Sequence, residues 1–92
     1  FLELKPDNLI FSALKKAEDS DDVILRFFES RGEPTRAVIS FFRPISRASI
    51  VDLLEREERE IQVEGDKLEL EVKPFEIVTL KLRPQGFLFG KG

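Results

Sequence analysis

Hydrophobic and polar residues alternate strictly in several short segments of this chain. The clearest segment is 67–73, where leucine or valine fills every second position and lysine or glutamate fills the positions between. Because successive side chains of a β-strand point to opposite faces, this period of two predicts a strand with one apolar face. The same pattern, or a short apolar run, predicts strands at 1–5, 9–14, 23–30, 35–43, 48–54, 61–63 and 75–83.

Residues that favour turns separate these expected strands. Glycine, proline, asparagine or aspartate mark turns at 6–8, 31–34 and 65–66, and proline interrupts the pattern at Pro44 and Pro74. About seven or eight short strands with turns between them are typical of an antiparallel sandwich. The sequence therefore predicts an all-β fold of this kind. The apolar run at 9–14 is expected to form a buried strand.

One stretch, at 46–60, also fits a helix. Three of its apolar residues are at helical spacing: Ile50, Leu53 and Leu54. A serine at 46 or 49 would cap the first turn of such a helix. We favour strand here because the flanking segments all carry strand patterns. The six consecutive charged residues at 55–60 are expected to form an exposed, mixed-charge segment.

Length and composition fit one globular domain. The chain has 92 residues, of which 41% are hydrophobic and 36% charged, which differs from the composition of disordered segments. We assign residues 1–83 to the sandwich and residues 84–92 to a C-terminal tail. The chain begins with phenylalanine and contains no methionine, so we expect it to be a piece of a longer product.

The charge balance and the apolar segments bear on location and partners. The net charge is −3, which argues against nonspecific binding to nucleic acid or to anionic membranes. No apolar run approaches the about 20 residues of a membrane-spanning helix, and we recognise no signal peptide. We therefore expect a cytoplasmic protein with neither a nucleic-acid nor a membrane partner.

Five residue types are absent: histidine, cysteine, methionine, tryptophan and tyrosine. Without histidine and cysteine the chain lacks the ligands of a tetrahedral zinc site and the partners of Ser-His or Cys-His nucleophiles. All nine aromatic residues are phenylalanine, which packs but offers a ligand no hydroxyl or indole N–H. We expect no catalytic residue, no metal site and no cofactor within these residues.

Acidic residues are the remaining candidates for chemistry. The acidic run at 18–22 would suit a calcium loop, but it lacks the glycine and the late glutamate of such loops, so we favour a solvated loop. Any two carboxylates could resemble a glycosidase pair, but the strand pattern already explains them. Glu76 shares the apolar face of its expected strand, and Arg26 stands between two apolar residues. For both we expect a salt bridge or an edge position.

The tail contains the strongest signal for an interaction. Phe87, Leu88 and Phe89 follow a turn close to the end of the chain. If they are exposed, they form an apolar patch that requires a partner. The alternative is that they cover the domain's own sandwich, and the sequence favours neither.

Four segments resemble, in the same order, the C-terminal β domain of glycoside hydrolase family 38 α-mannosidases. They are Asn8 to Asp19 (NLIFSALKKAED), Leu25 to Glu29 (LRFFE), Asp52 to Glu55 (DLLE) and Lys73 to Leu80 (KPFEIVTL). The resemblance implies a parent enzyme that is a retaining, zinc-dependent α-mannosidase acting on terminal α-mannosides. It also implies that the zinc ligands and the nucleophile lie in another domain, since none has a counterpart here.

What the resemblance implies for this chain is structural. We expect an ion network in which Lys16 or Arg26 pairs with Glu18 or Glu76 and pins the strands together. Glu29 and the opening of the last strand at 74–76 also belong to the matching segments. The domain would brace the remaining domains of the parent, its partners, and the resemblance also allows a homo-oligomer.

Two other function classes remain open at this point. One is an independent carbohydrate-binding β-sandwich, which the absence of tryptophan and tyrosine weighs against. The other is a stand-alone interaction domain. The tail residues Phe87, Leu88 and Phe89 lie outside the matching segments, and we expect them to form an interface that docks on a neighbouring domain.

Overall fold

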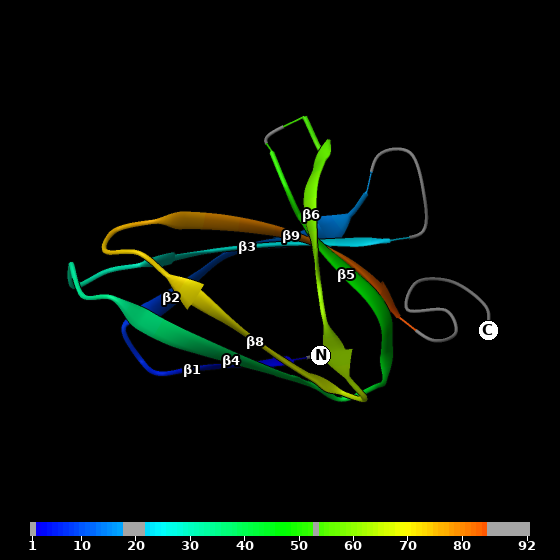
Figure 1. Cartoon of the computed structure of the whole chain (residues 1–92), viewed down its shortest axis with the longest axis horizontal. Helices are drawn as coiled ribbons and strands as arrows, with labels where there is room; N and C mark the ends of the chain where they lie inside the picture. The colour runs from blue at the N-terminus through cyan, green and yellow to red at the C-terminus, as the bar shows by residue number, and fades with distance from the viewer. Residues whose placement is uncertain (1, 18–21, 53, 85–92) are drawn as a thin grey trace.

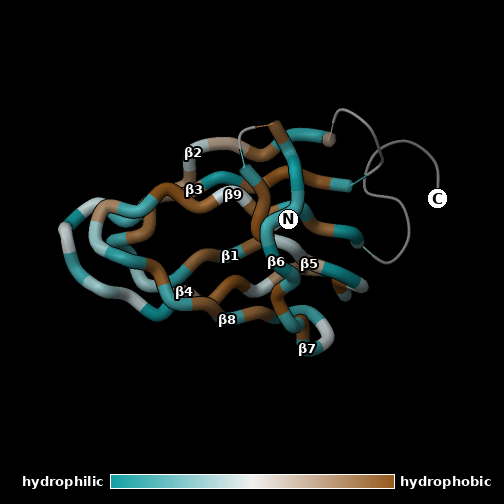
Figure 2. The backbone as a smooth tube through the Cα atoms, turned by 45° about the horizontal axis from the view of Figure 1, so that its top comes forward, coloured by the Kyte–Doolittle hydropathy of each residue, from teal (hydrophilic) through white to brown (hydrophobic). Residues whose placement is uncertain are grey.

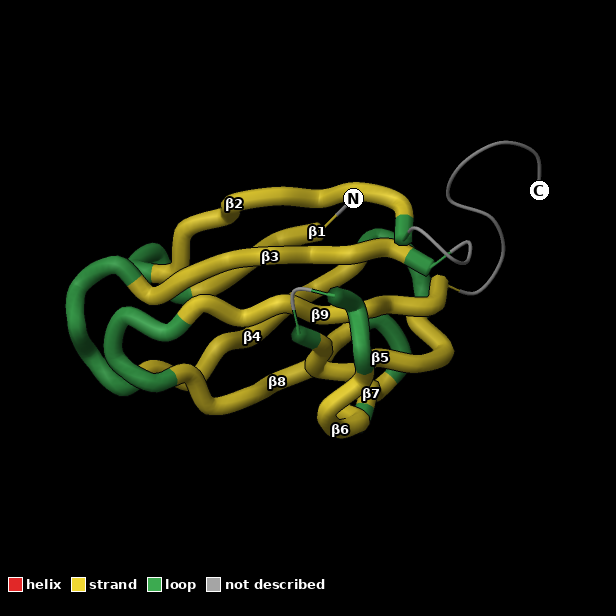
Figure 3. Tube along the Cα trace, turned by 90° about the horizontal axis from the view of Figure 1, so that it is seen from above, coloured by secondary structure: helices red, strands yellow, loops and turns green. Residues whose placement is uncertain are grey.

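The computed structural model describes residues 2–17, 22–52 and 54–84. Over these ranges nine β-strands form two antiparallel sheets that face each other (Figures 1 and 3). The predicted all-β sandwich is therefore confirmed, with nine strands where seven or eight were expected. The described ranges contain no helix of the length and apolarity that would cross a membrane.

The strands divide between a four-stranded and a five-stranded sheet. Across the four-stranded sheet the order is β1 (Leu2–Lys5), β4 (Thr35–Phe41), β8 (Lys67–Val72) and β7 (Val63–Glu64). Across the five-stranded sheet the order is β2 (Leu9–Lys16), β3 (Val23–Glu29), β9 (Ile77–Pro84), β5 (Ile45–Val51) and β6 (Glu57–Ile61).

The core fills the space between the two sheets. It is built from alternate positions of β3 and β9 on one side and of β4 and β8 on the other, as Figure 2 shows along β8. Full burial of one such leucine or phenylalanine stabilises the fold by about 2 kcal/mol. The inward-facing residues include Leu25, Phe27, Leu80, Leu82, Ala37, Ile39, Leu68 and Leu70.

The stretch that also fitted a helix forms a β-hairpin instead. β5 pairs with β6, and Asp52 closes the connection by accepting the backbone N–H groups of Leu54 and Arg56 at 2.9 Å each. β6 begins inside the charged segment at 55–60, for which we expected only an exposed segment, and ends at Ile61. It is an edge strand that buries only Ile61, so its sequence shows no apolar period.

The expectation of a buried strand at 9–14 is wrong. β2 covers this run, but it lies at the edge of its sheet and pairs with β3 alone. Leu9 is buried, whereas Phe11 is 51% exposed. A register shift between Phe11 and Ala13 further interrupts the pattern. An apolar run shows that a segment is hydrophobic, but it does not show how many neighbouring strands will cover it.

The last strand starts later than predicted, at Ile77 rather than at Phe75. Phe75 has a φ of 58°, which lies outside the extended conformation of a regular strand, and Glu76 belongs to the turn. The apolar face expected for this strand is confirmed, because Val78, Leu80 and Leu82 are buried. β9 also continues to Pro84, the first residue that we had assigned to the tail.

Candidate functional site

Glu29 is the most unusual polar residue of the core. It ends β3 on the inward face, in register with Leu25 and Phe27, and its side chain is 0% exposed. The ion pairs found among the described residues do not include it. A buried carboxylate without a counter-ion requires hydrogen bonds to keep its charge.

Five hydrogen bonds supply this stabilisation. Oε1 accepts the backbone N–H groups of Gly32 at 2.6 Å, Glu33 at 3.0 Å and Phe75 at 3.0 Å. Oε2 accepts the side-chain amide of Asn8 at 2.7 Å and the backbone N–H of Arg31 at 2.9 Å. The carboxylate therefore gathers donors from three separate segments of the chain.

These hydrogen bonds set the protonation state of Glu29. Burial alone raises the pKa of a carboxyl group, because it disfavours the charged form. The donors from Phe75, Asn8, Arg31 and Glu33 outweigh burial and lower the pKa of Glu29 from 4.5 to about 2. The group is thus a carboxylate at neutral pH, and it is enclosed by donors. Such a group holds a structure together and is unsuited to transferring a proton to a substrate.

The surrounding polar groups extend the same network. The Asn8 side chain also donates to the hydroxyl of Thr35 at 2.8 Å, and that hydroxyl donates to the backbone oxygen of Glu33 at 2.9 Å. Ser30 donates to the backbone oxygen of Asn8 through both its hydroxyl and its N–H. No buried side-chain polar atom in the described residues lacks a partner. We call this network the Glu29 cluster; it consists of Glu29, Asn8, Thr35 and the backbone donors Arg31, Gly32, Glu33 and Phe75.

The turn backbone is shaped to bring its donors to Glu29. Gly32 has a φ of +76°, which glycine adopts without steric cost. A Cβ at this position would lie 2.6 Å from Cε2 of Phe75, so the aromatic ring also requires glycine beneath it. Phe75 itself has a φ of 58°. Two left-handed residues therefore meet where the β3–β4 and β8–β9 turns converge.

The structure places Arg26 and Glu76 in separate hydrogen bonds rather than in the expected ion pair. The Arg26 Nε donates to the hydroxyl of Thr79 at 3.2 Å, directly across from it on β9. The Glu76 carboxylate accepts the backbone N–H of Lys73 at 2.8 Å, and its backbone oxygen accepts the N–H of Glu29 at 3.1 Å. Glu76 lies three positions before Thr79, the residue opposite Arg26. Three residues of extended chain span about 10 Å.

The other predicted site residues lie at or beyond the limits of the described ranges. Lys16 ends β2 opposite Val23, whereas Glu18 lies outside the described residues, so a pairing between them stays a prediction. Phe87, Leu88 and Phe89 also lie outside the described residues.

The acidic run considered for calcium contributes a salt bridge. Only Asp22 of this run is described, and both of its carboxylate oxygens contact Arg83, at 2.9 and 3.2 Å. This pairing raises the pKa of Arg83. It ties the start of β3 to the end of β9. On the opposite sheet, Arg36 bridges Glu69 and Glu71 at 2.7 and 2.6 Å.

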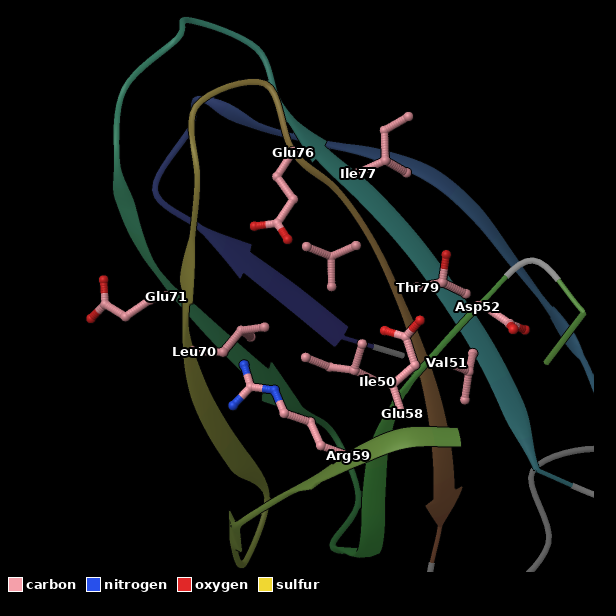
Figure 4. Close-up of a pocket in the computed structure, with 11 residues that line it drawn as sticks. Ile50, Val51, Asp52, Glu58, Arg59, Leu70, Glu71, Glu76, Ile77 and Thr79 are labelled. Atoms are coloured by element: carbon pink, nitrogen blue, oxygen red, sulfur yellow. The ribbon is translucent and has the colours of Figure 1, made fainter. Parts of the chain in front are cut away.

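A groove with a volume of about 330 Å³ opens between β8 and β9, and we call it the β8–β9 groove (Figure 4). Leu70, Val78 and Ile50 form its apolar floor. Glu76 and Arg59 point into it, whereas Glu71 points away from it in Figure 4. Among the described residues no group of three or more acidic side chains is arranged to hold a metal ion.

Fold and site together define a β-sandwich domain in which the enclosed Glu29 cluster serves structure. The family model of the glycosyl hydrolases family 38 C-terminal beta sandwich domain matches residues 8–80. The chain belongs to this family, which confirms the resemblance seen in the sequence, and it is a structural domain of this enzyme family. No curated protein and no solved structure matches the chain.

Sequence reasoning gave Glu29 no specific role, although the residue lies within one of the matching segments. A signal was present, because Glu29 continues the alternation of Val23, Leu25 and Phe27 on the inward face. The same alternation singled out Glu76, but Glu76 lies in the turn before β9 begins. Alternation along a strand therefore predicted a glutamate on an apolar face, but it pointed to Glu76 instead of Glu29.

Proposed function

We propose that this domain is the non-catalytic C-terminal domain of a zinc-dependent, retaining α-mannosidase that cleaves terminal α-mannosides. Its family membership supports a parent enzyme with further domains. The enclosed state of Glu29 supports a structural rather than a catalytic role. The domain's task in this proposal is to brace the other domains of the parent in mannoside breakdown.

One observation carries the proposal: an apolar row on the outer face of the five-stranded sheet. Ile10 on β2 stands opposite Phe28 on β3, and Phe28 stands opposite Ile77 on β9. The adjacent row contains Phe27 and Val78, which face the core, so this row faces outward.

The exposure of this row is high for apolar residues. Ile10 is 41% exposed and Ile77 is 65% exposed, with Phe28 partly buried between them. Phe75, which is 67% exposed, lies two positions before Ile77. A contiguous patch of this kind marks a surface that another domain covers. The proposal assigns this surface to the neighbouring domains of the parent.

Zinc belongs to those other domains in this proposal. The chain has no histidine or cysteine, and the described acidic residues form no group suited to a metal ion. The residues of this domain do not fit a zinc site, and its contribution is to packing. A cytoplasmic location and a homo-oligomeric assembly are further parts of the proposal, as is the docking of Phe87, Leu88 and Phe89 on a neighbouring domain.

The proposal is tested in the parent enzyme by the substitution Ile10→Lys, because Ile10 belongs to the apolar row but does not line the β8–β9 groove. We expect a lower midpoint of thermal unfolding and weaker retention of this domain after limited proteolysis. Hydrolysis of an aryl α-mannoside per folded molecule should remain unchanged. The matched control is Phe42→Lys, because Phe42 is also exposed, at 77%, but lies next to β4 and away from the row.

Three results would contradict the proposal. Equal effects of the two substitutions would show that the apolar row is not the surface covered by neighbouring domains. Hydrolysis of an aryl mannoside by the 92-residue chain with added zinc would overturn the non-catalytic role. Saturable binding of mannose to this chain would favour a carbohydrate-binding module instead.

A further inference from the structure

Two strand edges border the β8–β9 groove, and neither has a partner strand in the described part of the chain. β5 pairs with β9 only from Leu80 onward, and β7 pairs with β8 only as far as Leu68. Residues 77–79 of β9 and 69–72 of β8 therefore have a neighbouring strand on one side only. These free edges face the groove from two different sheets.

The hydrogen-bond pattern shows which backbone groups of β9 are directed at the groove. The N–H of Glu29 donates to the backbone oxygen of Glu76 at 3.1 Å. In an antiparallel pair the groups that bond to the partner alternate along each strand, so Val78 is the next residue to bond to β3. The N–H and C=O of Ile77 consequently point away from β3, into the groove.

The same argument applies to β8. The N–H of Phe41 donates to the backbone oxygen of Asp66 at 2.7 Å, in register with the β4–β8 ladder. The alternation makes Leu68 and Leu70 the residues that bond to β4. The N–H and C=O of Glu71 therefore point away from β4, toward the groove. Unpaired edges of this kind accept an additional strand.

Side chains add charge to these backbone groups. Leu70 and Val78 are buried in the floor, and Ile50 is partly buried beside them. Glu76 lies toward one end of the groove and Arg59 toward the other, with Glu58 also in the lining beside Arg59 (Figure 4). Arg59 has no ion-pair partner among the described residues, and the Glu76 carboxylate bonds to a backbone N–H rather than to a cation.

We propose that the β8–β9 groove binds an extended segment of the larger glycosyl hydrolase as an additional antiparallel strand on β8. Antiparallel pairing follows because both present neighbours of β8 run antiparallel to it. Such a strand enters beside Glu76 and leaves beside Arg59. The segment is apolar over the floor, basic where it enters and acidic where it leaves. This inference rests on the proposed function, because the segment comes from the parent outside these 92 residues.

Charge argues against a second copy of this chain as the occupant. The free edge of β8 carries Glu69 and Glu71, which share the single cation of Arg36, so two such edges would still place an excess of negative charge opposite each other. Like charges at directly opposed strand positions are destabilising. The basic and acidic positions of a separate segment match the groove instead.

The first test uses a capped pentapeptide of the sequence Lys-Val-Thr-Val-Glu and a charge-swapped Glu-Val-Thr-Val-Lys peptide, each titrated into the 92-residue chain. We expect saturable binding of the first peptide, with changes in the amide NMR signals of Glu71 and Ile77. The charge-swapped peptide should bind about fivefold more weakly. Equal binding of the two peptides, or signal changes away from these amides, would overturn the proposal.

The second test is the substitution Arg59→Glu. The Arg59 side chain is exposed and makes no described hydrogen bond, so the fold should remain intact. The variant should bind a Lys-Val-Thr-Val-Lys peptide more tightly than the Lys-Val-Thr-Val-Glu peptide. The unchanged chain should show the opposite preference between these two peptides. Lys67→Glu is the matched control, because it makes the same charge change outside the groove lining. An unchanged preference in Arg59→Glu would contradict the assigned orientation.

The third test compares hydrogen exchange in the parent enzyme and in the 92-residue chain. We expect the amide of Glu71 to exchange at least about tenfold more slowly in the parent, because the strand added to β8 accepts its N–H. Equal exchange would overturn the proposal, and protection that depends on concentration in the isolated chain would indicate a second copy. The proposed function can survive either outcome, since the Ile10→Lys comparison tests the outer face at a residue that does not line the groove.

Discussion

The backbone N–H of Phe75 donates a 3.0 Å hydrogen bond to Oε1 of Glu29, across 46 positions of sequence. This bond connects the β8–β9 turn to the end of β3, while Asn8 connects the start of β2 to the same carboxylate. One buried side chain thus fixes the meeting point of three connections at one end of the sandwich. The stability of the domain should depend on it more than on any exposed ion pair.

The substitution Glu29→Gln tests this dependence. Glutamine retains one carbonyl oxygen, but its NH₂ group faces N–H donors that the carboxylate had accepted. Buried donors without a partner are strongly destabilising, so we expect the midpoint of thermal unfolding to fall by roughly 10 °C. Circular dichroism on heating measures the change.

A nearby control separates the buried site from loss of charge alone. Glu33→Gln makes the same chemical change in the adjoining turn, at an exposed side chain for which no contact is described. It should shift the midpoint by less than about 2 °C. Similar shifts for the two variants would show that the Glu29 cluster does not brace the fold.

The lowered pKa of Glu29 also predicts a pH dependence. A carboxyl group whose pKa is lower in the folded than in the unfolded chain adds stability that is full above the unfolded pKa. That stability disappears as the pH falls from about 4.5 toward the folded pKa of about 2. The difference in urea midpoint between the chain and Glu29→Gln should therefore stay constant above about pH 5 and shrink toward about pH 2. A difference that grows on acidification would contradict the assigned ionisation state.

Alternation along the chain predicted the sandwich because the core strands are half-buried. The pattern at 67–73 became β8 with Leu68, Leu70 and Val72 facing inward, as parity requires. The pattern failed at β2 and β6, which are both edge strands. The neighbours of an edge strand are set by the whole topology, and a local pattern carries no information about topology.

The candidate site was less accessible to sequence reasoning. Four of the five hydrogen bonds to Glu29 come from backbone N–H groups, those of Arg31, Gly32, Glu33 and Phe75. Backbone donors leave no trace in residue type, and their convergence depends on left-handed turn conformations. The family resemblance included both Glu29 and Phe75, but it could not show that they touch.

Two glycines with left-handed backbones predict different costs for the same substitution. Gly32 and Gly65 have φ values of +76° and +66°, but only Gly32 lies beneath another residue. Gly65→Ala should cost about 1 kcal/mol from backbone strain alone. Gly32→Ala should cost at least about 1 kcal/mol more, because its Cβ would collide with the Phe75 ring. Urea denaturation measures both values.

A double variant identifies the source of the additional cost. Phe75→Ala removes the ring atoms that lie 2.6 and 2.7 Å from the place where the new Cβ would stand. In that background the cost of Gly32→Ala should fall to the cost of Gly65→Ala. If the cost remained, a donor lost from the Glu29 cluster rather than the ring would explain it.

The two arginine ion pairs should differ in strength because their carboxylates differ in burial. The Asp22 side chain is 10% exposed beside Arg83, whereas Glu69 and Glu71 are 43% and 70% exposed beside Arg36. Solvent screens the second pair more strongly, although Arg83 itself is 54% exposed. Arg83→Ala should therefore lower the thermal midpoint by about 4 °C and Arg36→Ala by about 2 °C or less. Arg83→Lys should recover only part of the loss, because an ammonium group cannot bond both oxygens of Asp22 in the geometry of a guanidinium. Full recovery by lysine, or equal losses for the two alanine variants, would show that simple charge and not the paired geometry holds β3 to β9.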